Sequence, residues 1–233
     1  MKSNQRGGLI KSVIGKKVLM ALTGLFLVVF LMGHLAGNLQ LFLGGEAGKL
    51  QFNEYAYFMT HNPAVKLLSY ITYASIFVHV ADAIVLSLAN RKARPIGYAV
   101  ANANNANSHW TSRNMGILGT IVLAFIVIHM RNFWYEMHWG NLPVQFSQNY
   151  NKEIKDLHTI VVAEFQEPFA VILYVLAMFG VGFHLYHGVA SGFQSLGLGY
   201  KSIYGKMQLG GKIFAIVVPI LFASIPLYIY FMM

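Results

Sequence analysis

The chain has 233 residues, of which 56% are hydrophobic and only 11% are charged, and it contains no cysteine. A soluble domain usually has about 25% charged residues, so this composition argues against an ordinary soluble protein. Without cysteine the chain cannot itself supply a disulfide, a zinc–thiolate site or the ligands of an iron–sulfur cluster. A net charge of +9 would be compatible with nucleic-acid binding, but the distribution of that charge favours another explanation.

Five apolar segments follow one another, and each is close to the roughly 20 residues that cross about 30 Å of hydrocarbon as a helix. They cover residues 18–43, 65–89, 115–135, 169–190 and 213–231. The sequence therefore predicts an all-α integral membrane bundle of five transmembrane helices, with 1–233 as a single domain. A soluble protein with buried helices is disfavoured, because five such segments leave little chain to cover them.

Basic and acidic residues alternate between the connections. The basic ones lie before the first segment, between the second and third, and between the fourth and fifth: Lys2, Arg6, Lys11, Lys16, Lys17, Arg91, Lys92, Arg94, Arg113, Lys201, Lys206 and Lys212. By the positive-inside rule this predicts a multi-pass protein with a cytoplasmic N-terminus and an external C-terminus, and it makes nucleic acid an improbable partner. The first apolar segment is too long for a secretory signal and has no small-residue cleavage site, so we predict a retained helix.

Each of the first four segments contains one histidine well inside it: His34, His79, His129 and His184. Counted from the external end at about 1.5 Å per residue, His34 and His129 lie about 12–15 Å deep, and His79 and His184 about 20–25 Å deep. Two imidazoles that face each other at one depth can be the two axial ligands of a haem iron. This predicts two b haems, an outer one between His34 and His129 and an inner one between His79 and His184.

Small residues at helical spacing support the inner pair. Ser75 and Ala83 flank His79, and Gly180 and Gly188 flank His184, which would clear surface for a flat macrocycle. The outer pair has Gly37 after His34, whereas His129 is flanked by phenylalanines. Plain helix packing would also explain such glycines. Four histidines in two depth-matched pairs favour haem, because ionisable residues inside a membrane are costly and usually functional.

The remaining polar residues receive secondary roles. His187 is the rival of His184 as a ligand and is otherwise predicted to be its hydrogen-bond partner. Arg131 is a candidate partner of an outer haem propionate. Four other histidines are predicted to be solvated, with His61 also a candidate for an external quinone pocket: His61, His109, His138 and His158. A short surface helix is predicted over residues 152–165.

The strongest local pattern surrounds the fourth histidine, in the run His184-Leu-Tyr-His-Gly188-Val-Ala-Ser-Gly-Phe-Gln-Ser-Leu-Gly197, and similar context occurs at Gly33-His34-Leu35 and before Phe133-Trp134. Over nearly its whole length the chain resembles the five-helix, single-polypeptide di-haem cytochrome b anchor of bacterial succinate dehydrogenase and fumarate reductase. In that family a ligand histidine precedes a glycine by four residues and another by thirteen, which favours His184 over His187.

The resemblance implies electron transfer between a quinone, usually menaquinone, and a flavoprotein and iron–sulfur subunit pair docked on the cytoplasmic face of the bacterial inner membrane. It also makes Glu54 a candidate quinone residue, because some members place a functional glutamate there; a solvated loop acid is an equal alternative. Some fumarate reductases carry a glutamate two residues before the fourth histidine, where this chain has Gly182. The corresponding proton route is therefore in doubt.

Two other readings stay open. A di-haem cytochrome b of a hydrogenase or formate dehydrogenase is disfavoured by the order of one histidine per segment with none in the fifth. A haem-free transporter or proton channel with histidine relays would need further acids at mid-depth, and only Asp82 comes near. No nucleotide loop, nucleophile triad or thiolate is present, so chemistry on a dicarboxylate would belong to partner subunits.

Overall fold

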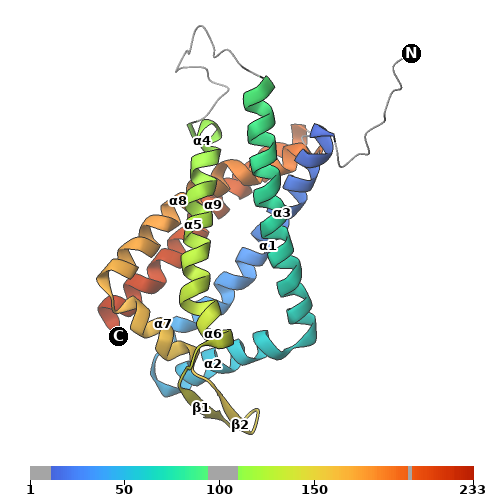
Figure 1. Cartoon of the computed structure of the whole chain (residues 1–233). Coiled ribbons are helices and arrows are strands. Elements are labelled where there is room, and N and C mark those ends of the chain that lie inside the picture. The colour runs from blue at the N-terminus through green and yellow to red at the C-terminus, as the bar shows by residue number, and fades with distance from the viewer. Residues whose placement is uncertain (1–11, 94–109, 199–200) are drawn as a thin grey trace, which may run out of the picture.

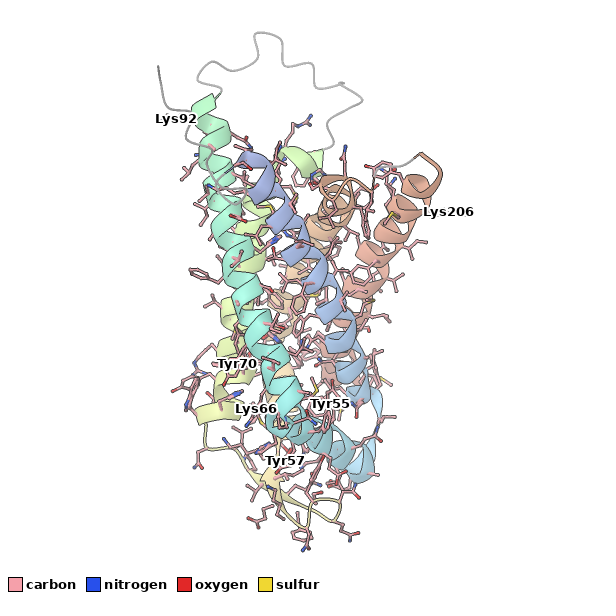
Figure 2. All side chains as sticks on the ribbon, turned by 90° about the vertical axis from the view of Figure 1, so that its right-hand side faces the viewer. Tyr55, Tyr57, Lys66, Tyr70, Lys92 and Lys206 are labelled. Atoms are coloured by element: carbon pink, nitrogen blue, oxygen red, sulfur yellow. The ribbon has the colours of Figure 1, made fainter. Side chains whose placement is uncertain are left out.

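The computed structural model describes residues 12–93, 110–198 and 201–233, which form a helical bundle with a small layer of structure across one end (Figure 1). Four basic residues of the predicted charge pattern and one histidine predicted to be solvated lie outside these residues: Lys2, Arg6, Lys11, Arg94 and His109. The other basic positions lie at the end of the bundle away from that layer, as Lys92 and Lys206 show in Figure 2. We call this the basic end.

Five long helices make up the bundle: α1 (Val13–Asn38), α3 (Pro63–Ala93), α5 (Met115–His129), α8 (Pro168–Ser195) and α9 (Lys201–Met232). The short helix α4 (Trp110–Arg113) precedes α5, and η2 (Leu39–Phe42) extends α1 by one tight turn. Within the described residues five helical spans are long and apolar enough to cross a membrane, so the predicted all-α, multi-pass bundle is confirmed at that level. The last helix contains the predicted segment 213–231 and begins earlier, at Lys201.

The α5 helix changes its winding after His129. Residues Met130–Tyr135 (η3) form a π-helical turn, and α6 (Glu136–Trp139) completes the span. A π-helical turn contains an extra residue relative to α-helix, so it rotates everything that follows around the helix axis. Side chains after His129 therefore face directions that a regular helical period does not predict.

Packing is uneven among the spans. The α8 and α9 helices pack along most of their length, α1 packs on α3 and α8, and α3 meets α5 at few points. In an 18-residue apolar stretch of each span, 39% and 33% of the residues of α8 and α9 are buried within the protein, against 11%, 11% and 6% for α1, α3 and α5. The α8–α9 pair is thus the packed core of the bundle, and apolar surface of the other spans faces outward, as a lipid solvent permits.

Close approach of α8 to α9 explains Gly182. A Cβ atom at this position would lie 3.2 Å from the Ala215 carbonyl oxygen and 3.6 Å from Cγ of Pro219. Pro219 and Pro226 lie inside α9, where neighbouring helices can satisfy the carbonyls that proline leaves free. The small residue at 182 therefore serves helix packing here.

The layer at the other end, which we call the cap, consists of α2 (Gly45–His61), β1 (Val144–Ser147), β2 (Lys152–Lys155) and α7 (Leu157–Phe165). The two strands are antiparallel, with Val144 opposite Lys155. The predicted helix over residues 152–165 is therefore wrong in its first part. The helix starts only after Asp156, whose carboxylate accepts a hydrogen bond of 3.0 Å from the Thr159 amide and caps the N-terminus.

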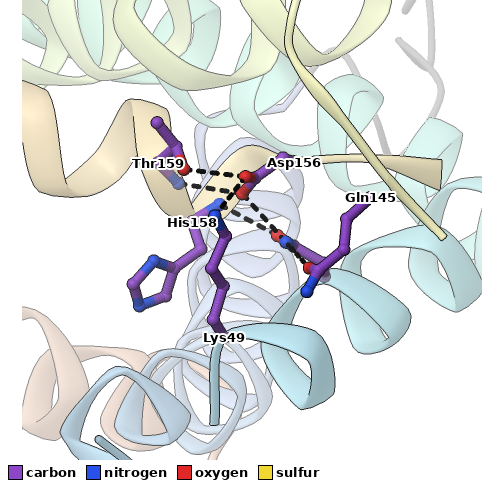
Figure 3. Close-up of polar contacts among 6 residues, drawn as sticks. Lys49, Gln145, Asp156, His158 and Thr159 are labelled. Atoms are coloured by element: carbon purple, nitrogen blue, oxygen red, sulfur yellow. Dashed lines mark hydrogen bonds and ion pairs between the residues drawn. The ribbon is translucent and has the colours of Figure 1, made fainter. Parts of the chain in front are cut away.

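A buried polar network holds the pieces of the cap together (Figure 3). Asn53 of α2 is fully buried and donates to Oε1 of Gln145 and Oδ1 of Asp156, both at 2.9 Å. It also accepts a 2.9 Å hydrogen bond from the His158 amide, and Lys49 pairs with Asp156 at 2.7 Å. The prediction that His158 is solvated is wrong, because only 7% of it is exposed.

The network also sets the charge state of the cap. Burial alone would raise the pKa of Asp156, but the hydrogen bonds from Lys49, Thr159 and Asn53 together hold this pKa below its usual value. Burial lowers the pKa of His158, and the nearby Asp156 charge opposes that shift only in part. The cap therefore carries a charged aspartate beside a neutral imidazole at neutral pH.

Apolar packing joins the cap to the bundle. The buried cluster combines Phe52 of α2 and Val161 and Phe165 of α7 with side chains of η2, α8 and α9: Leu41, Val171, Tyr174, Ile225 and Ile229. Aromatic side chains gather at the same level, where Nε1 of Trp134 donates to the Tyr73 hydroxyl at 2.7 Å. Tyr70 and Tyr57 lie at this end in Figure 2. Tyrosine and tryptophan are enriched where a membrane meets water, so this level is a natural membrane boundary.

Candidate site: two facing histidine pairs

The four histidines of the spans meet in two pairs. His34 of α1 and His129 of α5 have ring centres 5.7 Å apart with planes at 87°, and we call them the cap-side pair. His79 of α3 and His184 of α8 have ring centres 6.3 Å apart with planes at 70°, and we call them the deep pair. These are the two pairs that helix depth predicts from the sequence.

The pairs lie at different levels because of their positions along the helices. His79 and His184 each lie sixteen residues after the proline that begins their helix, which is about 24 Å at 1.5 Å per residue. His129 lies ten residues before Trp139, the end of its span, or about 15 Å from the cap end. The two levels are therefore separated by about 10 Å along the bundle axis.

The ring spacing suits two imidazoles on opposite sides of one metal ion. With each imidazole nitrogen about 2 Å from the metal, the two ring centres would be about 6 Å apart. Among the described residues no group of three or more His, Cys, Asp or Glu side chains is placed to hold a metal ion. A pair is nevertheless enough for haem iron, because the porphyrin supplies the other four nitrogens and the protein only the axial ligands.

Thr23 orients His79. Its hydroxyl lies 3.2 Å from Nδ1 of His79 and itself donates to the Leu19 carbonyl at 2.9 Å. With its proton directed at Leu19, the hydroxyl accepts from Nδ1–H, which leaves Nε2 of His79 with a free lone pair for a metal. Gly24 lies on the same face of α1, where a Cβ atom would come within 3.1 Å of the His79 ring.

Each pair also contains a buried ring nitrogen without a partner in the described part of the chain. Nδ1 of His129 and Nδ1 of His184 are buried, and neither has a hydrogen-bond partner among the described residues. His34 has only a long contact of 3.5 Å from the Asn38 amide to its Nδ1. Each unpaired buried polar atom destabilises the folded protein by about 1–3 kcal/mol, and such atoms are rare in folded proteins. These residues fit a group that binds imidazole in the bundle interior.

The small residues predicted to flank a macrocycle have different surroundings. Nothing lies within 4 Å of a Cβ atom built on Gly188, whereas one on Gly180 would be 3.0 Å from Cγ2 of Ile121. Ser75 is buried and Ala83 half-buried, each one turn from His79. A Cβ atom on Gly37 would lie 2.6 Å from the Tyr55 hydroxyl oxygen, so this glycine lets α2 approach α1.

The two candidate quinone residues lie in the cap. Both carboxylate oxygens of Glu54 accept hydrogen bonds from the hairpin turn, at 2.5 Å from the Ser147 hydroxyl and 2.7 Å from the Asn149 amide. The alternative of a solvated loop acid is wrong, since Glu54 lies on α2 and is half-buried. His61 is exposed at the end of α2 and stacks on Tyr57 with ring centres 3.9 Å apart.

Arg131 and His187 lie next to the pairs in sequence. Arg131 is exposed; its guanidinium donates to Oε1 of Glu136 at 2.7 Å and lies over the Tyr135 ring. His187 is half-buried, three residues after His184 on α8. The ring that faces His79 in the deep pair is that of His184.

Sequence reasoning missed a polar group beside the cap-side pair. Asn132, three residues after His129, donates a 2.6 Å hydrogen bond to Oε1 of Glu164 on α7. Tyr174 of α8 is buried with its ring centre 6.0 Å from that of His129, and its hydroxyl has no hydrogen-bond partner among the described residues. The π-helical turn directs Asn132 toward α7, and no sequence period reveals such a turn.

Electrostatics distinguish Glu164 from the other acids of the cap. Burial raises the pKa of Glu164, the Glu167 carboxylate raises it further, and the Arg131 charge opposes both. Because Arg131 is engaged by Glu136, it is only a partial counter-charge. Glu164 can therefore gain a proton more readily than an exposed glutamate.

Comparison with known proteins adds no assignment. No protein-family model, no curated protein and no solved structure matches the chain.

Proposed function

We propose that the protein is a di-haem cytochrome b that anchors a succinate dehydrogenase or fumarate reductase complex in a bacterial inner membrane and passes electrons between its iron–sulfur subunit and a quinone. The observation that carries the proposal is the arrangement of four histidines, one on each of four spans, as two facing pairs with ring centres 5.7 and 6.3 Å apart. The order of the four histidines over five spans, and the resemblance of the sequence around them, support the choice of complex.

The histidine pairs, their neighbours and the two ends of the bundle then have separate physical tasks. A haem held by each pair would supply one-electron transfer, and the two levels, about 10 Å apart, would form a relay across the membrane. Thr23 keeps His79 in the tautomer that binds metal, and the apolar spans keep water away from both levels. The basic end would dock the flavoprotein and iron–sulfur subunits on the cytoplasmic side, and the cap would face outward.

The quinone site stays a prediction. Menaquinone is the expected substrate, and Glu54 and His61 are the candidate residues because both belong to the cap, at the end of the bundle that is nearer to the cap-side pair. The hydrogen bonds of Glu54 to Ser147 and Asn149 give it a structural role as well. A quinol that displaced either donor would offer Glu54 an O–H donor in its place.

A haem count on histidine variants tests the proposal. We expect the purified wild-type protein to give a b-type redox difference spectrum and two haems per chain in a pyridine haemochrome assay. His184→Ala should lose one haem, whereas the matched control His187→Ala, three residues away on the same helix, should keep both. A folded wild-type protein without haem would overturn the proposal, and loss of a haem in His187→Ala alone would overturn the ligand assignment.

One observation favours a second candidate, a histidine-based proton relay without haem. Oδ2 of Asp82, three residues after His79, is buried and has no hydrogen-bond partner among the described residues. An acid and an imidazole at neighbouring depths could exchange a proton. This candidate predicts a haem-free protein that moves protons in vesicles and loses that activity in Asp82→Asn.

A further inference from the structure

The cap-side pair has a protonatable neighbour that the proposed function does not use. Among the described residues five buried side-chain atoms have no hydrogen-bond partner, and two of them, Nδ1 of His129 and the hydroxyl oxygen of Tyr174, belong to rings whose centres are 6.0 Å apart. Asn132 lies one turn after His129 and binds the Glu164 carboxylate at 2.6 Å. Polar atoms are thus concentrated on one side of the cap-side pair in an otherwise apolar region.

The surroundings of Glu164 make it responsive to a charge in the bundle. The carboxylate is half-buried between α7, η3 and the start of α8, and the groups that act on it are Asn132 and Arg131 of η3, Glu167 before α8, and Tyr174 of α8. Arg131 forms an ion pair with Glu136, and the Asn132 amide is neutral. A negative charge added nearby would therefore meet little competing positive charge.

We propose that Glu164 is the proton-exchanging group of the cap-side pair: it takes up one proton from the solution at the cap end when an electron arrives between His34 and His129, and releases it when the electron leaves. This inference rests on the proposed function, because it requires a haem iron on that pair. The balance is one electron gained by ferric iron and one proton gained by the carboxylate, and a quinol or the iron–sulfur subunit supplies the electron.

The physical reason is charge compensation in a medium of low dielectric constant. Reduction of a buried ferric haem adds one negative charge, which destabilises an ionised carboxylate close by and raises its pKa. Because burial and Glu167 already raise the pKa of Glu164, a further rise brings its titration toward neutral pH. Asn132 can hold the side chain in both protonation states, since an amide N–H donates to a carboxylate oxygen and also to the carbonyl oxygen of a protonated carboxyl group.

The test is the pH dependence of the two haem midpoint potentials, measured by redox titration of the purified full-length protein. The potential of the cap-side haem, identified by its loss in His34→Ala, should fall with rising pH with a slope of up to about 59 mV per unit, the value for one proton per electron. Glu164→Gln keeps the oxygen that faces Asn132 and removes the charge, so this slope should vanish. Glu164→Asp should restore it.

Glu153→Gln is the matched control, because Glu153 is an exposed acid of the same charge on β2 in the cap and is not among the groups that act on Glu164. It should keep the slope. In infrared difference spectra, reduction of the wild type should produce a protonated-carboxyl band that is absent from Glu164→Gln. An unchanged slope in a Glu164→Gln protein with two haems would overturn the inference and leave the proposed function standing; a haem-free wild type would overturn both.

Discussion

Asn53 is the residue whose loss should loosen the cap most. It is fully buried, donates to Gln145 and Asp156, and accepts from the His158 amide, all at 2.9 Å. In Asn53→Ala the buried His158 N–H would have no acceptor, which costs about 1–3 kcal/mol. The bond to the charged Asp156 would be lost as well, at the lower end of about 1.5–3 kcal/mol, because Lys49 still pairs with that carboxylate.

The expected total is about 3 kcal/mol, which corresponds to about a 100-fold change in a local opening equilibrium at 1.4 kcal/mol per factor of ten. Hydrogen exchange followed by mass spectrometry on the detergent-solubilised protein measures this directly. Amides of α2 and α7 should exchange about 100-fold faster in Asn53→Ala, while those in the middle of α8 and α9 should not change.

Gln51→Ala is the control for this experiment. Gln51 lies on the same helix but is exposed, and its amide makes one long hydrogen bond of 3.3 Å to Gln40. Its replacement should leave the exchange of the cap within a factor of about two or three, as expected for a surface change within ±0.5 kcal/mol. Equal effects of the two variants would refute the argument that the buried network holds α2 to α7.

Two further predictions concern the midpoint potential of the deep haem and the pH dependence of the stability of the cap. Thr23→Val removes the acceptor of His79 Nδ1–H, which makes the imidazole a weaker electron donor to the iron. The midpoint potential of the deep haem alone should rise, by up to about 40 mV for a hydrogen bond of about 1 kcal/mol. Thr120→Val replaces an exposed threonine on α5 and should not change this potential in the same redox titration. Acidification should loosen the cap in two stages. Burial keeps the pKa of folded His158 below 6.5, so the unfolded chain binds a proton first, and the stability that is full above pH 6.5 falls as the pH drops below it. Asp156, whose folded pKa lies below 3.8, contributes stability above that pH and adds a second loss only as the pH falls through its folded value. His158→Gln should remove the first stage from hydrogen exchange of α7 and keep the second; a first stage that persists would contradict the assignment.

Several features follow from the sequence because they depend on local composition and period. Five apolar stretches of membrane length predict five spans whatever their packing, since each helix satisfies its own backbone in lipid. One histidine per span, with a rise of 1.5 Å per residue, is enough to predict which two share a depth. The ring contacts of His34 with His129 and of His79 with His184 agree with that arithmetic.

Other features depend on contacts between residues far apart in the chain. Asn53 meets Asp156 across more than one hundred positions, and the strands β1 and β2 exist because they pair with each other, so neither is visible in a local pattern. The same holds for Glu54, which reads as a loop acid and is in fact bonded to the hairpin turn.

The sequence by itself determined the number of spans, the level of each histidine and the alternation of charged ends, because hydrophobic length, helical rise and charge placement act segment by segment. Only the tertiary structure decided which side chains surround those histidines. The π-helical turn after His129 rotates Asn132 toward Glu164, and Gly37 serves the approach of Tyr55. Such choices arise from the direction in which helices meet, and that direction is a property of the packed bundle and of no single segment.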